Sequence, residues 1–527
     1  MTIDVLDPVD AGARDGRGRR PRHVRVAIVG TGFSGLGMAI RLRQRGIEDF
    51  VVLERAGEVG GTWRDNTYPG CACDVQAHLY SFSFARNPHW KSAFGSQPEV
   101  LDYLRRCADR FGVRPHIRFR HEVLGARWDE PEQRWHVETS GGDYTAQVLV
   151  SGMGYLSEPS IPALPGLDTF EGTAFHSARW DHDHDLSGRR VAVIGTGASA
   201  IQFVPKIQPV VGHLDLYQRT PPWIGPKHDK PSAGLNGWAI RNVPGYQRFR
   251  RGFNQWGREV LAFAMNRPVL MKQVQKNLPA KHLAESIEDP ELRAKLTPDY
   301  VTGCKRLLFS DDYYPAITQP NVELVTDGIA EVRPRSIVTV DGREREIDTI
   351  IFGTGFRVTD QPIAALVRGR GGLRLADAWD EGMSAYKGTT VAGFPNLFVL
   401  LGPNTTLGHS SMTLMIEAQI AYVLDCLRKM DRRGLATVEV RPGAQAAYNE
   451  KLQAMLSRTV WNTGGCRSWY LDAQGRNTTI WPTYTWRFRR RTKRFDLRSY
   501  DVADPWQTAE GGSRSPRRAA AASPPGA

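Results

Sequence analysis

Two glycine-rich turns in this 527-residue sequence have the spacing of dinucleotide-binding sites. The first, GTGFSG over residues 30–35, comes directly after an apolar run and directly before a helical pattern. In such a turn Gly30 permits the tight bend, Gly32 lets the backbone approach a pyrophosphate, and Gly35 lets helix and strand pack closely. Glu54 follows Gly30 by 24 residues, where its carboxylate can accept hydrogen bonds from both hydroxyls of an adenosine ribose. The first turn therefore predicts a site for a dinucleotide with a free ribose.

A second turn, GTGASA over residues 195–200, again lies between an apolar run and a helical pattern. The residue that follows Gly195 by the same 24 positions is Arg219, so a base stands where the first turn has an acid. A carboxylate would repel a ribose 2′-phosphate, whereas a guanidinium can bind it bidentately, and Thr220 could add a hydroxyl donor. With FAD at the first turn and NADPH at the second, the chain is expected to be a flavoprotein that takes hydride from NADPH. The alternative for Arg219 is a solvated arginine at the end of a strand.

The cysteine and histidine patterns predict neither a redox disulfide nor a metal site. Cys71 and Cys73 are only two residues apart and would point to opposite faces of a strand. The six cysteines follow no regular framework, which fits reduced thiols in a cytoplasmic protein. No Cys/His set has zinc spacing, and the HDHD run over 182–185 lies in a polar stretch, where we expect it to be solvated.

The elements that must position these turns are visible as a repeating pattern. Apolar strand-like runs alternate with helical stretches, which predicts an α/β fold with two Rossmann-like dinucleotide-binding domains. Residues 228–300 lack strand runs and are expected to form a helical insertion that could serve as a lid or a pocket wall. The clearest strand runs are 24–30, 50–55, 189–195, 214–219, 347–353 and 396–402.

These patterns divide the chain into five expected parts. Two of them are disordered ends, and the FAD-binding domain is split by the NADP-binding domain, which contains the helical insertion. The expected boundaries are 1–22 for the N-terminal arm, 23–160 for the first part of the FAD-binding domain, 161–370 for the NADP-binding domain, 371–506 for the second part of the FAD-binding domain with substrate-pocket loops, and 507–527 for the C-terminal tail.

Composition and charge exclude several classes of protein. Hydrophobic residues make up 41% of the chain and charged residues 24%, which excludes disorder over the whole length. No apolar run approaches the ~18 residues needed to span a bilayer, and the N-terminus lacks the apolar core of a secretory signal. Much of the net charge of +13 lies at the ends, since residues 487–527 alone hold ten Lys/Arg against four Asp/Glu. We expect this tail to be a solvated extension with no nucleic-acid partner; binding to nucleic acid or to a membrane surface is the alternative.

Two longer motifs resemble signatures of the type I Baeyer–Villiger monooxygenases, within the class B flavoprotein monooxygenases. Residues 61–74, GTWRDNTYPGCACD, fit one family signature. Residues 170–181, FEGTAFHSARWD, fit the other and lie just before the second glycine turn, where the family places it. The sister N- or S-oxygenating flavin monooxygenases carry Tyr or Phe followed by a base where this chain has Trp180-Asp181. The resemblance extends over about residues 24–500.

The resemblance implies a reaction and a catalytic pair. In the family NADPH reduces FAD, O₂ adds to the flavin, and the resulting C4a-peroxyflavin attacks a ketone to give an ester or lactone. The peroxide must stay anionic and the adduct's oxyanion needs a fixed positive partner, and an arginine meets both needs because it keeps its proton. The family's arginine follows a Lys and precedes an acidic-Tyr-Tyr run, which matches Arg306 after Lys305 and before residues 311–314. Arg306 is then the catalytic arginine, Asp74 orients it, and Lys305 is a second contact to the 2′-phosphate.

The same resemblance implies cofactor contacts for other residues near the two turns. The expected FAD contacts, with Ser34 on the phosphates, are Gly30, Gly32, Ser34, Gly35, Glu54, Gly61, Thr62, Trp63, Asp74 and Tyr80. The expected NADP contacts are Gly195, Thr196, Gly197, Ser199, Ala200, Gln202, Arg219, Thr220 and Lys305. His176 and Trp180 lie at the family's interdomain linker, where they would couple movement of the NADP domain to turnover; a purely structural histidine is the alternative for His176.

The implied substrates are a small ketone and O₂. Segments 402–411 and 464–470 resemble the branch near the 4-hydroxyacetophenone and linear-ketone enzymes and are expected to border the substrate pocket. Trp469 and Trp481 could line that pocket or belong to the core. The leading alternative is a flavin monooxygenase that oxygenates sulfides or amines, and a flavin- and NADPH-binding protein without catalysis is a more distant one. Without the resemblance, Arg306 would be taken as part of a solvated basic pair.

Overall fold

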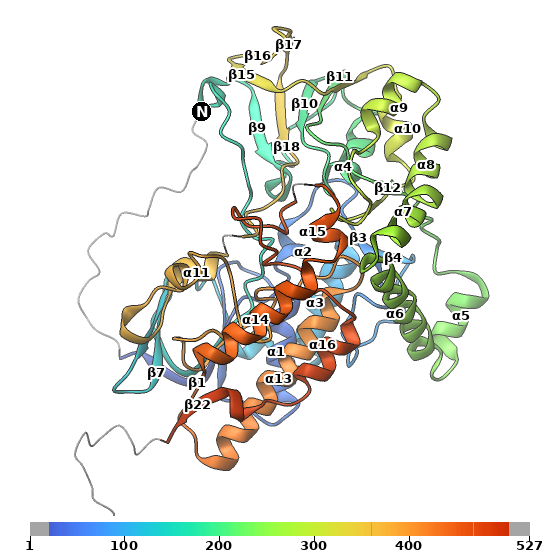
Figure 1. Ribbon diagram of the computed structural model, residues 1–527. Coiled ribbons are helices and arrows are strands. Elements are labelled where there is room, and N and C mark those ends of the chain that lie inside the picture. The colour runs from blue at the N-terminus through green and yellow to red at the C-terminus, as the bar shows by residue number, and fades with distance from the viewer. Residues whose placement is uncertain (1–19, 360, 467, 505–527) are drawn as a thin grey trace, which may run out of the picture.

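The computed structural model describes residues 20–504 apart from residues 360 and 467. The tail predicted over 507–527, and nearly all of the arm predicted over 1–22, lie outside these residues. The described part contains two units, each built on a largely parallel sheet, with a group of helices beside the second (Figure 1). The predicted α/β fold with two Rossmann-like domains and a helical insertion is confirmed.

The first unit is built around β1 (Arg22–Val29), which pairs in parallel with β2 (Phe50–Glu54) and with β8 (Tyr144–Ser151). These strands are buried on both faces over most of their length, which is why they appear in the sequence as continuous apolar runs. α1 (Phe33–Arg43) follows β1 directly after the first glycine turn. The sheet order is β19-β6-β7-β8-β1-β2-β5, with β20 beside β8, and the added strands are β5 (Ile117–Phe119), β6 (Val123–Asp129), β7 (Arg134–Thr139), β19 (Val367–Arg368) and β20 (Leu397–Val399).

The second unit is centred on β10 (Arg190–Ile194), which lies between β11 (His213–Tyr217) and β18 (Thr349–Phe352). The sheet is parallel throughout, in the order β14-β11-β10-β18-β9, with β14 (Val322–Val325) and β9 (Thr173–His176) at its edges. α4 (Ala200–Ile207) follows the second glycine turn and packs against α10 (Tyr313–Ile317). A small antiparallel sheet follows β14, made of β15 (Ile329–Arg333), β16 (Ser336–Thr339) and β17 (Glu344–Glu346).

The insertion predicted over residues 228–300 is helical. Three of its helices begin with a proline, Pro268, Pro279 and Pro290, because the fixed φ of proline suits the first helical turn, where its missing N–H is not needed. The helices are α5 (Gly234–Asn242), α6 (Tyr246–Met265), α7 (Pro268–Asn277), α8 (Pro279–Ser286) and α9 (Pro290–Leu296).

The chain then returns to the first unit. β19 pairs in the larger sheet. It precedes residue 370, where we expected the NADP-binding domain to end. α13 (Met412–Arg433) is buried over most of its length against α1 and α16 (Thr485–Thr492) (Figure 1). No helix in the described ranges is both long and apolar enough to cross a membrane. The remaining elements are α2 (Thr62–Asp65), β3 (Ala72–Gln76), β4 (Phe94–Ser96), α3 (Gln97–Arg110), β12 (Ile224–Gly225), β13 (Leu308–Phe309), α11 (Pro362–Leu366), α12 (Leu375–Ala378), β21 (Thr437–Val440), α14 (Pro442–Leu456), α15 (Val460–Thr463) and β22 (Tyr500–Ala503).

Two chain segments connect the units, and they run side by side. The backbone N–H of Ser160 donates to the carbonyl of Gly355 at 2.9 Å, and that of Arg357 donates to the carbonyl of Glu158 at 3.0 Å. The chain thus passes from the first unit to the second and back through two segments that are hydrogen-bonded to each other.

One prediction about the cysteines is wrong. Cys304 and Cys466 form a disulfide across 162 residues, whereas we expected all six cysteines to be reduced. Sequence spacing could not reveal this pair, because only the folded chain brings the loop before Arg306 against the loop after α15. The other cysteines, Cys71, Cys73, Cys107 and Cys426, are free and buried.

Candidate active site

The first glycine turn is shaped by close backbone contacts. Gly30 has φ +91°, and a Cβ there would lie 3.0 Å from the carbonyl oxygen of Gly152 at the end of β8. A Cβ on Gly35 would lie 1.9 Å from the carbonyl oxygen of Gly30. Gly32 differs, since a Cβ there would meet only the Cα of Gly61, at 3.8 Å. Gly30 and Gly35 are therefore required by packing, and so is Gly61, where a Cβ would lie 3.0 Å from the Cα of Gly32. Gly32 leaves the backbone open to a bound pyrophosphate.

Glu54 lies where the sequence places it, buried at the end of β2, but protein donors surround its carboxylate. It accepts hydrogen bonds from the backbone N–H of Thr31 at 3.0 Å and from that of Ala56 at 2.9 Å. Arg64 contributes an ion pair at 3.0 Å. Glu54 thus holds the glycine turn in place, and its contact with a ribose stays a prediction.

The aromatic residues predicted at the first site lie together. The indole N–H of Trp63 donates to the hydroxyl of Tyr80 at 3.0 Å, and the two rings meet edge to face. Thr62 is exposed at the start of α2, directly after Gly61. Ser34 is buried in the first turn of α1. The structure therefore gathers these side chains around the first glycine turn.

The second glycine turn repeats the packing of the first. Gly195 has φ +105°, and a Cβ there would lie 2.7 Å from the carbonyl oxygen of Gly353 at the end of β18. In both units the first glycine of the turn thus packs against a glycine at the end of the neighbouring parallel strand. Gly197 is exposed, whereas Thr196 and Ala200 are buried beneath it. Ser199 precedes α4 as its N-cap residue.

Arg219 and Lys305 are two cations near each other, and Asp299 is an acid close enough to act on Lys305. Burial lowers the pKa of Lys305, and the positive charge of Arg219 lowers it further. Neither side chain makes an ion pair with a carboxylate in the part of the chain that the structure describes, and the Lys305 ammonium lies 5.0 Å from the ring centroid of Tyr300. Thr220, next to Arg219, is half-buried. Two cations held near each other, with no described carboxylate in ion-pair contact with either, fit a ligand that carries a phosphate.

Asp74 and Arg306 form the predicted pair. β3 carries Asp74, and the loop before β13 carries Arg306, which donates from Nε at 2.6 Å and from Nη2 at 2.7 Å to the two carboxylate oxygens. Its Nη1 donates to the carbonyl oxygen of Leu407 at 3.3 Å. Burial opposes the charge of Arg306, but the Asp74 carboxylate outweighs it and raises the pKa of the guanidinium above its usual range. Arg306 is therefore a permanent cation with a fixed orientation.

A second arginine reaches the same place from α6, and sequence reasoning missed it. Arg258 donates from Nη2 to the side-chain oxygen of Gln76 at 2.9 Å. Burial lowers the pKa of Arg258, while the nearby Asp74 carboxylate opposes that shift. One signal was available: Arg251 and Arg258 are seven residues apart, on the helix face opposite a run of large apolar residues. Two arginines on that face must point toward the protein.

A group of buried polar atoms lies close to Arg306. His409 is fully buried, and neither of its ring nitrogens has a hydrogen-bond partner among the described residues. Burial lowers its pKa to about 3, and the charges of Arg258 and Arg306 add to that effect, so the imidazole is neutral. Other buried polar atoms without partners in the described chain belong to Asn404, Ser410, Thr478 and Thr479. Such a cluster fits a polar ring system that would supply the missing hydrogen bonds.

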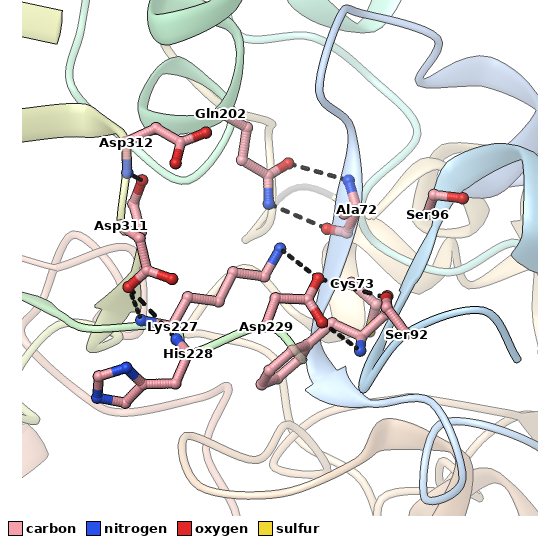
Figure 2. Close-up of polar contacts among 12 residues, drawn as sticks. Ala72, Cys73, Ser92, Ser96, Gln202, Lys227, His228, Asp229, Asp311 and Asp312 are labelled. Atoms are coloured by element: carbon pink, nitrogen blue, oxygen red, sulfur yellow. Dashed lines mark hydrogen bonds and ion pairs between the residues drawn. The ribbon is translucent and has the colours of Figure 1, made fainter. Parts of the chain in front are cut away.

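Figure 2 shows polar contacts between the two units. Gln202 of α4 donates its amide to the carbonyl of Ala72 at 3.0 Å and accepts from the N–H of Ala72 at 3.2 Å. The hydroxyl of Tyr68 donates to the same side chain at 3.0 Å. Asp229 accepts from the N–H of Phe94 at 3.3 Å. Gln202, predicted as an NADP contact, therefore uses its amide to join the second unit to β3, one residue from Cys73 and two from Asp74.

The linker residues His176 and Trp180 lie in the packed junction. His176 is buried at the end of β9, and its Nδ1 accepts from the N–H of Ala178 at 3.1 Å. Burial lowers its pKa to about 4. Trp180 packs against Phe175 and against Phe203 of α4, with ring centroids 5.2 and 5.3 Å apart. His176 belongs to the second unit and Trp180 packs on it, and the coupling role stays a prediction.

The described residues contain one cluster with metal-ligating groups, made of His213, Asp215 and Glu323. Arg345 donates to Glu323 at 2.8 Å and has its Nε 3.7 Å from Asp215, so the acids are already paired with a cation. In the run 182–185, the two histidines bond to hydroxyl groups on different segments of the chain. Neither place is an open metal site.

Comparison with known proteins bears on all of these residues. The model of the pyridine nucleotide-disulphide oxidoreductases matches residues 27–252, which include both glycine turns. A Baeyer–Villiger monooxygenase of Streptomyces coelicolor is 54% identical over 485 residues, which make up 92% of this chain and 93% of that protein. Another, of Pseudomonas aeruginosa, is 54% identical over 91% of this chain and 92% of its own length. This chain belongs to the Baeyer–Villiger monooxygenases.

Solved structures agree with the family. A complex of OTEMO with FAD and NADP has a TM-score of 0.83 at 28% identity, and the match covers 92% of this chain and 100% of that one. The closed structure of cyclohexanone monooxygenase has a TM-score of 0.81 at 30% identity, with the same coverage. For this Baeyer–Villiger monooxygenase the resemblance carried by residues 61–74 and 170–181 is confirmed, and it is favoured over a sulfide- or amine-oxygenating enzyme.

Both predicted pocket segments of this Baeyer–Villiger monooxygenase come close to Arg306, through Leu407 and Tyr470. Segment 402–411 contains Leu407, which accepts from Arg306. Trp469, 42% exposed, packs against Tyr155 with ring centroids 6.2 Å apart. Trp481 is fully buried against Phe488 and is a core residue. A small cavity beside Tyr155 is lined by Val358, Gln361, Met383, Thr406, Thr478 and Thr479, among others.

Proposed function

We propose that this Baeyer–Villiger monooxygenase binds FAD at the first glycine turn and NADPH at the second. In the overall reaction one oxygen atom of O₂ is inserted into the C–C bond next to a ketone carbonyl. The ketone, O₂, NADPH and a proton are consumed, and an ester or lactone, water and NADP⁺ are released. When bound, the two cofactors supply the hydride and the activation of O₂.

The fit of the two cofactor sites rests on features already described. Gly32 leaves open backbone in the turn, and Trp63 and Tyr80 form an aromatic pair near it, which suits a flavin dinucleotide. Arg219 and Lys305 offer two unpaired cations to a 2′-phosphate, which distinguishes NADPH from NADH. For the other residues predicted at the two turns we propose the same two cofactors, because these residues lie in or next to the same turns.

The bidentate pair of Asp74 and Arg306 carries the proposal. Asp74 keeps the guanidinium protonated and pointing one way, so Arg306 offers positive charge without offering a proton. Negative charge that develops on the ketone carbonyl oxygen is then stabilised by a donor that needs no reorganisation. Arg258 adds a second buried cation close to the pair, and the neutral His409 does not compete with it.

We place the enzyme in the cytoplasm, which the four free cysteines fit and to which the Cys304–Cys466 disulfide is an exception. The substrate we propose is an apolar ketone of the linear or aryl type. Segments 402–411 and 464–470 support this choice, because both lie beside Arg306 and contribute aromatic and small polar side chains to the pocket region. Gln202 holds the second unit against β3 of the first, and His176 and Trp180, packed within the second unit, would transmit its movement to the catalytic pair.

The test uses the purified flavoprotein. NADPH oxidation is followed over a panel of linear, cyclic and aryl ketones and matched sulfides, with mass analysis for a gain of one oxygen. We expect ester formation in proportion to NADPH consumed. NADPH oxidation that yields only hydrogen peroxide with every ketone, or oxygen transfer to sulfides alone, would overturn the proposal.

A further inference from the structure

A row of large apolar side chains lies exposed along α6. Its members are between 41% and 70% exposed. They follow one another at spacings of four and three residues, which places them on one face of the helix. Figure 1 shows α5 and α6 at the edge of the molecule, away from both sheets. The row, which we call the α6 stripe, consists of Phe249, Phe253, Trp256, Val260 and Phe263.

The neighbouring helices extend this surface. Leu235 and Trp238 of α5 and Val269 of α7 are each more than half exposed, and both helices pack against α6. Single exposed apolar residues are common on folded proteins, but a group of aromatic and aliphatic side chains on adjacent helices marks a surface that another molecule covers.

The segment that carries the α6 stripe is mainly positive, with Asp229 and Glu285 just outside it. Residues 230–281 contain ten Lys or Arg and a single acidic residue, Glu259, which is buried. The Arg267 guanidinium lies 3.8 Å from the ring centroid of Phe263, at the end of the stripe. The exposed cations of this segment are Lys230, Arg241, Arg248, Arg267, Lys272, Lys276 and Lys281, the last of which pairs with Glu285.

We propose that the α6 stripe and its basic rim bind the surface of an anionic lipid bilayer. Phe and Trp side chains of an amphipathic helix enter the boundary between headgroups and acyl chains, while flanking Lys and Arg pair with anionic headgroups. A second copy of the chain is a poorer occupant, because a two-fold contact through this face would set the basic rim against itself. The positive charge around the stripe therefore favours an anionic lipid surface over a second copy of the chain as the partner.

The opposite face of α6 leads to the catalytic pair. Arg251 donates to the carbonyl oxygens of residues 78, 79 and 81, and Arg258 reaches Gln76 beside Asp74. A helix that lies on the lipid surface would thus border the catalytic site on its inner side. Lipid binding itself does not depend on the ketone chemistry, so the two proposals can fail separately.

The test is co-sedimentation of the FAD-loaded enzyme with vesicles of phosphatidylcholine mixed with phosphatidylglycerol, and with vesicles of phosphatidylcholine alone. We expect binding to the mixed vesicles that weakens as salt is raised, and little binding to the neutral ones. The double variant Phe253→Ser/Trp256→Ser should bind the mixed vesicles about tenfold more weakly or worse, because it removes the two central apolar side chains.

Val260→Ser and Val340→Ser form a matched pair of variants. The two valines are 70% and 69% exposed, but Val340 lies in the turn after β16, far from the stripe in sequence and fold. Only Val260→Ser should weaken vesicle binding, while flavin absorbance and thermal unfolding show that each variant is folded. Equal loss in both variants, absence of binding to anionic vesicles, or a lipid-free dimer that Phe253→Ser/Trp256→Ser dissociates would each overturn the proposal.

Discussion

Asp74 and Arg306 are 232 residues apart in the sequence, yet the carboxylate accepts two parallel hydrogen bonds of 2.6 and 2.7 Å from the guanidinium. β3 of the first unit supplies the acid, and the loop that follows the helical insertion supplies the base. The charge pair therefore forms only when these two parts of the chain are packed together.

Arg306→Ala should separate the two halves of the reaction. We expect flavin reduction by NADPH to persist and ester formation to fall by ~10²–10³, because a preorganised donor at the carbonyl oxygen is lost. Rapid-mixing absorbance measures reduction, and mass analysis measures the ester. Arg335→Ala, at an exposed arginine between β15 and β16, is the control and should leave both unchanged. An unchanged ester yield in Arg306→Ala would rule out its catalytic role.

Arg219→Ala and Lys305→Ala should change the choice of nucleotide. Each is expected to raise the KM for NADPH by ~10-fold or more while the KM for NADH stays nearly constant, because NADH has no 2′-phosphate for these cations to hold. Steady-state kinetics with both nucleotides provides the measurement. Arg189→Ala, an exposed arginine of the same unit, is the matched control. Equal weakening for both nucleotides would place the two cations elsewhere on the ligand.

Cys466→Ser should loosen the loop that carries Arg306. Cys304 is two residues before Arg306, and its partner lies 162 residues further along the chain. Loss of the cross-link is expected to lower the free energy of unfolding by about 2–4 kcal/mol and to lower kcat for ester formation more than KM for NADPH. Denaturant unfolding and steady-state kinetics measure the two effects. Reductant should bring the wild-type enzyme to the level of the variant and leave the variant unchanged; a wild type indifferent to reductant contradicts this prediction.

Glu259 predicts a pH dependence of stability. Burial raises its pKa from 4.5 to about 7, although it accepts from the backbone N–H of Thr485. Because the folded pKa exceeds the unfolded one, this group favours the folded state below pH 4.5, and that contribution is lost as the pH rises to about 7.

Glu259→Gln removes the cost of the buried charge, so at pH 8 it should raise the free energy of unfolding by on the order of 1–3 kcal/mol, with little difference near pH 4. Unfolding in denaturant across this pH range measures the difference. Glu346→Gln, at a carboxylate that is exposed on β17, should show no such trend. A variant that is less stable than the wild type at pH 8 would show that the carboxylate is held by its hydrogen bonds rather than penalised by burial.

Local patterns predicted the main elements of the fold. β1, β2, β10, β11, β18 and β20 all occur where continuous apolar runs mark them, because a parallel strand is buried on both faces. Gly30 and Gly195 were predictable for the same reason, since each turn lies directly between such a strand and a helix. Arg306 and Asp74 were found through motif resemblance, and the structure brings them into contact.

Contacts between distant segments could not be predicted in this way. The Cys304–Cys466 disulfide, the reach of Arg258 to Gln76 and the use of the Gln202 amide on Ala72 all depend on how separate units pack. Glu54 illustrates a second limit: its position follows from the strand pattern, but the donors around its carboxylate follow from the shape of the turn.

The two connecting segments near residues 158 and 357 bear on how parts of this enzyme could be exchanged with those of related enzymes. Since the chain leaves the larger sheet near residue 158 and re-enters it near residue 357 along hydrogen-bonded neighbours, everything between is a single cassette whose two ends meet. A chimera made by exchanging this part of the chain would have Arg306 and α6 from one parent and Asp74 on β3 from the other. Such hybrids would therefore take the two partners of the Asp74–Arg306 ion pair from two different parent enzymes.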